Sequence, residues 1–325
     1  MSITSAMFTG VSGLLANAEG INVIGNNLAN VNTVGFKDGR MLFSDMLSAN
    51  IGNGSQIGRG TQIQTVDNIY SQGTFETTTS NTDLAIQGNS FFAVKDPNST
   101  APVNQNAAML TRAGAFSLDS NLTLVNPDGY QVLDTQGNPI KFNDNAAAIT
   151  AANAALTAAN TAVPIVPADV AAAQTLLGTA NSLAFSKITS IDPSGLITYL
   201  GKDGITTNYY NTSGAVGVPA NAANAATVQR LAVVTVANPG GLEKAGGTLF
   251  KPTTASGISS NAFTLADNSA NGSSEKIYTN SLEQSNVDMA SEFVKMILTQ
   301  RAYSANSKTI TTADEMTQEV LQLKR

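Results

Sequence analysis

The side chains that most often carry out chemistry in proteins are missing from this sequence or scarce in it. The chain contains no Cys and no His, so it lacks the thiolate nucleophile, the commonest general base and the commonest metal ligand. A Ser-His-Asp triad is excluded for the same reason. Catalysis by carboxylates alone stays open, but aromatic residues, which usually form the platforms of carbohydrate enzymes, make up only 6% of the chain. The sequence therefore predicts a protein that is not an enzyme and holds no cofactor.

A few acidic and glycine positions have a spacing that invites a ligand-binding interpretation. Asp119 and Asp128 lie near turn-forming residues and could hold a cation, but Asp more often caps a turn through its own side chain. Gly25, Gly35 and Gly240-Gly241 are not phosphate loops, because no Lys-Ser/Thr pair follows any of them. We therefore predict turns capped by the two Asp residues, a helix stop at Gly35, and no metal or nucleotide at any of these positions.

Charge and hydropathy exclude two further classes of partner. The formal net charge is -6, and Lys and Arg do not cluster as a nucleic-acid footprint requires. No stretch approaches the ~20 apolar residues of a membrane span. The first residues have neither the basic region nor the unbroken apolar core of a secretory signal peptide. We expect no nucleic acid, no membrane insertion and, if the chain leaves the cell, export without a cleavable signal.

What the N-terminal segment does carry is a seven-residue apolar repeat. This repeat is typical of a helix that packs along a narrow seam, as in a coiled coil. Six asparagines in and directly after this segment, Asn17, Asn22, Asn26, Asn27, Asn30 and Asn32, offer amides that require hydrogen-bond partners, and neighbouring copies of the chain could supply them. We predict a helix over 5–31 whose assembly interface consists of Met7, Val11, Leu14, Ala18, Ile21, Asn26, Asn27, Leu28 and Asn30.

The C-terminal segment carries a second seven-residue repeat. Thr312 followed by Glu315 could cap a new helix, so a kink near residue 310 is compatible with the pattern. Gln300 and Arg301 either form a polar patch between subunits or lie on a solvated helix face. The predicted interface here consists of Met289, Phe293, Met296, Gln300, Arg301, Tyr303, Ile310, Val320 and Leu323.

Between the two helices the sequence changes to short apolar runs separated by turn signals, which indicate antiparallel strands. Gln87-Gly88-Asn89 predicts one hairpin, and Asn126-Pro127-Asp128-Gly129 predicts another. Half of the positions in 146–173 are Ala, interrupted by Pro164 and Pro167, which predicts two short helices or a helical arm.

These elements define an α+β protein. We predict a discontinuous helical coiled-coil stalk from both termini, residues 1–31 with 285–325. An extended connecting segment, 32–75, runs beside it. A mainly antiparallel β domain uses 76–142 with 182–284, and residues 143–181 form the Ala-rich helical insertion.

Several motifs together resemble the flagellar rod and hook axial proteins. GVSGLLANAEGINVIGNNLANVNTVGFK, residues 10–37, is similar to the N-terminal signature of that family. NTDLAIQGNSFFAV (81–94), TRAGAFSLDSNLTLVNPDGYQVL (111–133) and VANPGGLEKAGGTLF (236–250) resemble its first β domain. Residues 282–323 resemble its C-terminal helix. The motifs cover about half of the chain and both of its ends.

The resemblance implies a structural role and a set of partners. Such proteins pair their terminal helices in an inner tube around a channel and place their β domains outside. They are exported unfolded through the flagellar type III export apparatus and assemble at the growing tip. The implied partners are further copies of the chain in a helical polymer, together with rod, hook-cap and hook-filament junction proteins. The implied location is the extracellular flagellar hook or the basal body.

Three readings stay open at this stage. Val23-Ile24-Gly25-Asn26 and the run 40–47 look closer to a hook subunit, a tubular universal joint that transmits torque to the filament. The Ala-rich stretch, in place of the large mid-chain β domain typical of hooks, leaves a distal rod subunit as the alternative. A secreted β-rich adhesin or carbohydrate-active protein is the alternative from another class, and it predicts a signal peptide and paired carboxylates.

Overall fold

The computed structural model describes residues 3–52, 55–99, 103–162, 166–210, 218–219, 228–258, 262–270 and 275–323. The outermost residues of the predicted stalk, 1–2 and 324–325, lie outside these ranges. The chain divides into two compact units, Met1–Gly73 with Ser285–Arg325 and Thr74–Gln284. The protein is α+β, as predicted, and every strand pairing between the described strands is antiparallel.

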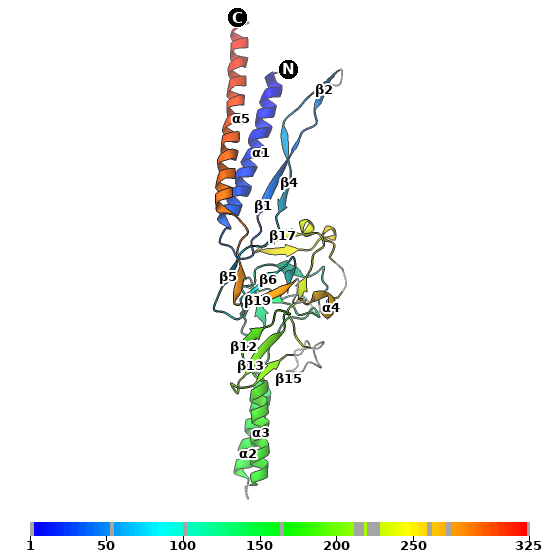
Figure 1. Cartoon of the computed structure of the whole chain (residues 1–325), viewed down its shortest axis with the longest axis vertical. Helices are drawn as coiled ribbons and strands as arrows, with labels where there is room; N and C mark the ends of the chain where they lie inside the picture. The colour runs from blue at the N-terminus through cyan, green and yellow to red at the C-terminus, as the bar shows by residue number, and fades with distance from the viewer. Residues whose placement is uncertain are drawn as a thin grey trace. The chain divides into compact units, whose positions relative to one another are not determined.

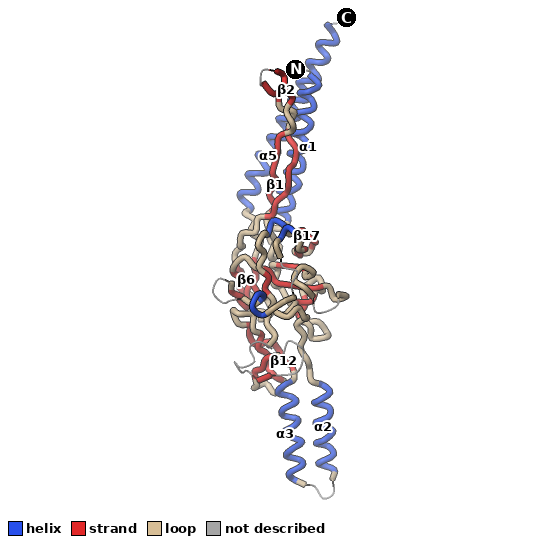
Figure 2. The backbone as a smooth tube through the Cα atoms, turned by 90° about the vertical axis from the view of Figure 1, so that its right-hand side faces the viewer, coloured by secondary structure: helices blue, strands red, loops and turns tan. Residues whose placement is uncertain are grey.

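The first unit contains both terminal helices and a long hairpin. Helices α1 (Ile3–Ala29) and α5 (Met289–Leu323) lie side by side (Figures 1 and 2). Strand β1 (Gly39–Asp45) pairs with β4 (Thr61–Asn68) and shows a register shift between Leu42 and Phe43. Strands β2 (Ala49–Gly52) and β3 (Ser55–Ile57) extend the same hairpin. The segment predicted as an extended connection is therefore largely a hairpin.

A glycine turn follows the end of α1, whereas α5 continues through a run of threonines. Gly35 has a φ of 70°, a left-handed conformation that reverses the chain soon after α1, as its sequence position predicts. Thr312 and Glu315 do not cap a new helix near residue 310, because α5 is continuous through this region. The Thr309 and Thr312 hydroxyls donate to the carbonyls of Ala305 and Lys308, so the helix keeps these poor helix formers within its own hydrogen bonding.

The second unit is organised around an eight-stranded sheet. Its order is β17 (Glu243–Gly246), β18 (Leu249–Lys251), β8 (Met109–Thr111), β7 (Phe91–Lys95), β11 (Gln131–Val132), β10 (Leu124–Val125) and β9 (Ser117–Leu118), and β16 (Val233–Val234) also pairs with β7. A four-stranded sheet follows the order β12 (Phe185–Ile191), β13 (Ile197–Gly201), β14 (Thr207–Tyr209) and β15 (Val218–Pro219).

Smaller elements complete this unit. They are the pair β5 (Phe75–Thr77) with β20 (Ser281–Glu283), the pair β6 (Leu84–Gln87) with β19 (Lys276–Thr279), the short helix α4 (Leu265–Asn268), and the 3-10 turns Pro239–Gly241 and Thr254–Ser256.

One predicted hairpin is present and one is wrong. The turn at 126–129 joins β10 to β11, which pair through Val125 and Gln131. Gln87-Gly88-Asn89 does not join a hairpin, because β6 pairs with β19 whereas β7 enters the large sheet. Leu84, Ala85 and Ile86 and the whole of β7 are buried, so long-range burial and not the local turn decides their partners.

The Ala-rich insertion is a helical hairpin, as predicted. Helices α2 (Ala146–Thr161) and α3 (Pro167–Leu183) pack against each other, and Pro167 occupies the first turn of α3, where a missing N–H costs nothing. The arm begins and ends at the core of the second unit. Phe142, before α2, stacks on Phe185, after α3, at a centroid distance of 4.6 Å, and Tyr199 stacks on Tyr210 at 4.3 Å.

Candidate assembly interface

Helix α1 meets α5 along a line of small residues. Its buried positions are Gly10, Gly13, Ala16, Gly20, Ile24 and Asn27. A Cβ atom added at Gly13 would lie 2.5 Å from Asn306 Nδ2, and one added at Gly10 would lie 2.9 Å from Ile310 Cγ1. Because both distances are below van der Waals contact, the glycines allow the helix axes to approach closely.

The matching face of α5 carries a strict repeat. Glu292, Thr299, Asn306 and Ala313 are seven apart, and Met296, Tyr303 and Ile310 form the second row of the same face. Glu292 and Ala313 are buried, whereas Tyr303 remains 41% exposed. Three of the predicted C-terminal interface residues, Met296, Tyr303 and Ile310, therefore share the face that packs against α1.

The predicted N-terminal stripe lies on a different face of α1. Val11, Leu14 and Ile21 each follow a buried position by one residue, so they lie about 100° round the helix from the contact with α5. Val11 is 42% exposed, and Met7, Leu14, Ala18, Ile21 and Leu28 are only partly buried. These residues are left available within one copy of the chain, and their role between copies stays a prediction.

Asn27 joins three segments inside the subunit. Its side chain is 1% exposed. Its Nδ2 donates to the Gly39 carbonyl at 2.8 Å and to Glu292 Oε2 at 3.2 Å, and its Oδ1 accepts from the Gly39 N–H at 2.9 Å. Glu292 also accepts from Lys295. Sequence reasoning placed this amide between subunits, whereas the structure satisfies it within one chain.

The other two predicted asparagines lie at the end of the same helix. Asn30 Nδ2 donates to the Asn26 carbonyl at 2.8 Å, and Asn30 Oδ1 accepts from the Thr33 hydroxyl at 3.0 Å. Asn26 is exposed. These contacts stabilise the turn that leads out of α1.

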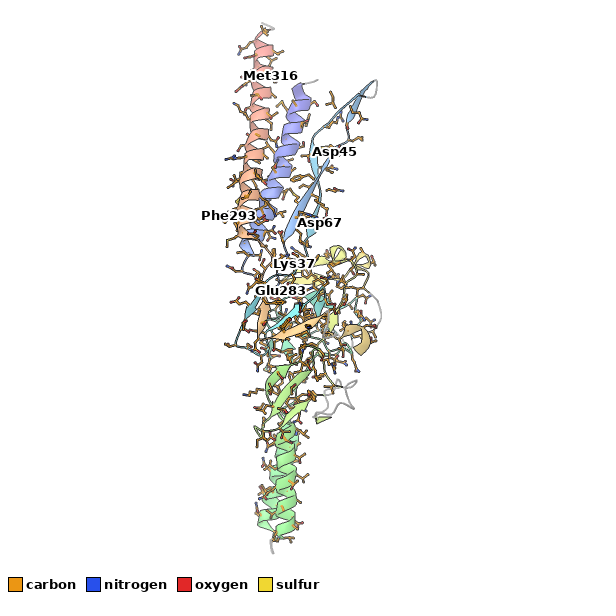
Figure 3. The ribbon with its side chains drawn as sticks, viewed as in Figure 1. Lys37, Asp45, Asp67, Glu283, Phe293 and Met316 are labelled. Carbon is orange, nitrogen blue, oxygen red and sulfur yellow. The ribbon has the colours of Figure 1, made fainter. Side chains whose placement is uncertain are left out.

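A second polar junction, which the sequence analysis did not identify, closes the base of this unit. Asn286 Oδ1 accepts from the Asp38 N–H at 2.8 Å, and its Nδ2 donates to the Ile69 carbonyl at 2.8 Å. The ammonium of Lys37, a side chain that is 1% exposed, donates to the Ser71 carbonyl at 2.8 Å (Figure 3). The segments that enter α5 and leave α1 are thus tied together through the backbone of the hairpin. The only sequence signal was that both segments belong to the quoted motifs.

Large apolar side chains remain exposed on the outer faces of both helices. Phe293 lies near the start of α5 and Met316 towards its end (Figure 3). Monomeric soluble proteins rarely leave large contiguous apolar surfaces uncovered, so these side chains are candidate contact residues. The exposed fractions on the helices are Phe8 73%, Leu15 66%, Met289 48%, Phe293 48%, Val294 57%, Ile297 51%, Leu298 61%, Met316 51%, Val320 55%, Leu321 63% and Leu323 87%.

The polar candidates on α5 are solvated in the isolated chain. Gln300 and Arg301 are both exposed. Among the described residues, no group of three or more acidic side chains gathers as a cation site would. No helix in the described ranges is long and apolar enough to cross a membrane.

The second unit holds a buried ion pair that the sequence did not indicate. Arg112 Nη1 lies 3.2 Å from Glu283 Oε2, and the two side chains are 2% and 0% exposed. The guanidinium also donates to the carbonyls of Ile86 and Gly88 and lies 5.0 Å from the centre of the Phe91 ring. Burial lowers the pKa of Arg112, and the charge of Glu283 opposes that shift. The pair ties β20 to the core of the unit.

Three family models match the chain. A model described as flagella basal body rod protein matches residues 7–37, the flagellar hook protein FlgE/F/G D1 domain matches 85–154, and the flagellar basal body rod FlgEFG protein C-terminal model matches 278–323. The first and last include most of α1 and all of α5.

Curated relatives match almost end to end. The chain is 33% identical to flagellar basal-body rod protein FlgG of Bacillus subtilis, over 98% of this chain and 99% of the relative. It is 32% identical to FlgG of Caulobacter vibrioides over 98% and 99%, and 27% identical to flagellar hook protein FlgE of Borreliella burgdorferi over 98% and 99%. The chain belongs to the flagellar basal-body rod and hook protein family.

Proposed function

We propose that this chain is a structural subunit that polymerises into a tubular axial segment of the flagellum. The observation that carries the proposal is the exposed apolar surface of α1 and α5, which one copy leaves uncovered. Burial of apolar surface contributes about 25 cal/mol per Å², so these faces supply a driving force for association. In the polymer the paired terminal helices serve as a coiled-coil stalk, and the β unit forms an outer layer.

The first candidate segment is the hook, a universal joint that transmits torque. It is supported by the hook-like motifs at 23–26 and 40–47 and by the end-to-end similarity to a protein named FlgE. The distal rod is the second candidate. It is favoured by a specific observation, the 33% identity to a rod protein over nearly the full length of both chains. Either segment implies the same partners, namely rod, cap and junction proteins and the type III export apparatus.

Polymerisation is tested with Leu14→Asp, which puts a charge on the available stripe of α1. We expect purified wild-type protein to form tubes and the variant to remain monomeric with a folded β unit, checked by electron microscopy and circular dichroism. Asn32→Asp, at an exposed position beyond the helix, is the charge-matched control. Tubes of normal length from Leu14→Asp would overturn the assignment of this stripe.

The segment is tested by immunogold labelling of isolated flagellar bases. A hook subunit predicts label along the curved external tube, and a distal rod subunit predicts label inside the basal body. Label confined to the cell surface away from flagella would contradict both candidates.

A further inference from the structure

The outward face of α5 carries charges of opposite sign at different heights. Arg301, Lys308 and Glu315 are seven apart, and Glu319 follows one turn later, so all four form one ridge along the helix. The buried positions Glu292 and Ala313, with Thr299 and Asn306, mark the face towards α1. Each residue of the seven-residue ridge follows such a position by two, which is about 200° round the helix. The ridge therefore points away from α1.

The four ridge charges form no ion pair with the residues that the structure describes. All four side chains are exposed. These four charges therefore add little to the stability of α5 in a single copy.

We infer that this ridge sets the register between neighbouring copies, an inference that rests on the proposed polymer. In an assembly of parallel copies without displacement, Arg301 would lie beside Arg301 and Glu315 beside Glu315, which is repulsive. Displacing one copy along the axis brings the basic segment of one ridge beside the acidic segment of the next. The partner of the ridge is thus a second copy of this chain.

The spacing of the charges gives the size of the displacement. Arg301 and Glu315 are 14 positions apart, and Lys308 and Glu319 are 11 positions apart. At 1.5 Å per residue these separations correspond to an axial offset of roughly 16 to 21 Å. Neighbouring helix axes lie about 8–10 Å apart when packed, a gap that Arg, Lys and Glu side chains bridge.

A different arrangement also matches opposite charges, and it makes a different assembly. Two antiparallel α5 helices related by a two-fold axis would place each basic segment on the partner's acidic segment. Such an isologous contact closes at two copies, whereas the staggered parallel contact is heterologous and continues into a filament. Exposed apolar residues Val294 and Ile297, on the same side of the helix, give a parallel array further surface to cover.

The test compares two adjacent substitutions that change the charge equally. Glu315→Lys lies on the ridge, whereas Asp314→Lys is exposed on another face of the same helix. We expect Glu315→Lys alone to raise the critical concentration for tube formation several-fold at low salt. Each double variant, Glu315→Lys/Glu319→Lys or Arg301→Glu/Lys308→Glu, should raise it at least tenfold. Asp314→Lys should change it less than twofold. Exposed charges are screened, so the differences should shrink as salt is raised.

Mixing the two double variants, and exchanging the signs of all four ridge charges in one chain, separate a loss of register from a failure to fold. The two double variants, each poor alone, should assemble into tubes when combined in equal amounts, and the fourfold swap of all ridge charges should restore assembly. Equal behaviour of Glu315→Lys and Asp314→Lys in a wild-type background that forms tubes would overturn the register and leave the proposed function intact. A closed dimer of wild-type protein would overturn the parallel arrangement. Failure of wild-type protein to form tubes would contradict the proposed function itself.

Discussion

Asn27 in α1 and Glu292 in α5 are 265 positions apart in the sequence, yet the Asn27 amide donates to Glu292 Oε2 at 3.2 Å inside the first unit. Both side chains are almost completely buried. The same amide satisfies both backbone groups of Gly39, so one residue fixes the positions of both helices and of the hairpin.

Removing this amide should weaken the first unit selectively. Asn27→Ala leaves the N–H and carbonyl of Gly39 and one oxygen of Glu292 without their partner, and each such loss costs about 1–3 kcal/mol. We expect faster hydrogen exchange in α1, α5 and β1 and unchanged exchange in the sheet of the second unit. Asn22→Ala, on the exposed side of the same helix, is the control and should leave exchange nearly unchanged. Equal effects of the two substitutions would show that the junction contributes nothing special.

The close approach of the terminal helices should depend on Gly13. Gly13→Leu places a side chain where a Cβ atom alone would lie 2.5 Å from Asn306 Nδ2, so the helices must separate. Gly25→Leu is the matched control, because no atom lies within 4 Å of the added Cβ. Leu is a better helix former than Gly by up to about 1 kcal/mol. Chemical denaturation of the monomer should therefore show a loss for Gly13→Leu and no loss, or a gain, for Gly25→Leu.

Asp134 should make the second unit more stable at mildly acidic pH. Its side chain is fully buried, its Oδ1 accepts from the backbone of Gln136 and Asn138, and burial raises its pKa from 3.8 to about 6. The folded state then binds the proton more tightly than the unfolded state. The favourable contribution is complete below the unfolded pKa and is lost as pH rises through about 6, for a difference of about 2–3 kcal/mol.

The measurement is the free energy of unfolding between pH 4.5 and 7.5 for wild-type protein and Asp134→Asn. The wild-type value should fall more steeply with rising pH than that of the variant, which cannot titrate at this position. Asp119→Asn is the control, because hydrogen bonds from Ser120 lower the pKa of Asp119 below its ordinary value of 3.8, so this carboxylate stays ionised over the measured range and the variant should keep the wild-type pH dependence. Parallel pH profiles for wild-type protein and Asp134→Asn would exclude this role.

The outer part of the α2–α3 arm should be dispensable for folding. In these helices only Ala152, Ala173 and Ala180 are buried, so the arm covers little large apolar surface. Deleting residues 156–175 and joining the ends with a short Gly-rich turn should keep the root of the arm and change the free energy of unfolding by less than about 1 kcal/mol. A loss of several kcal/mol would show that the outer arm contributes to the core. Circular dichroism and thermal unfolding measure the outcome.

The sequence predicted which segments are helical better than it predicted how they pack. The large apolar residues of α1 form the stripe containing Leu14 and Ile21, but the close contact with α5 uses Gly10, Gly13 and Gly20 on the adjacent face. Small residues permit close approach and leave no hydrophobic signal. On α5 the contact face includes Ile310, a large residue of the predicted interface, which lies against Gly10.

Long-range pairs lay beyond sequence reasoning for a different reason. Arg112 with Glu283, and Asn286 with Asp38, are joined only after distant segments come together. No local spacing in the sequence predicts these pairs. Because Arg is usually exposed, a sequence-based prediction places a residue such as Arg112 at the surface. The Ala-rich arm was predictable because its composition and its prolines specify local structure.

The ladder between β5 and β20 has a mechanical consequence for a protein under load. The chain crosses between its two units only at 73–74 and 284–285, and both crossings adjoin the end of the ladder where Phe75 faces Glu283. A pull between the units therefore draws both strands in the same direction. The load divides between two strands that remain in register, whereas opposed pulling would shear their hydrogen bonds. Arg112, the residue that follows β8, holds Glu283 at that end, so part of the force passes from β20 through a buried ion pair to the end of β8 in the large sheet.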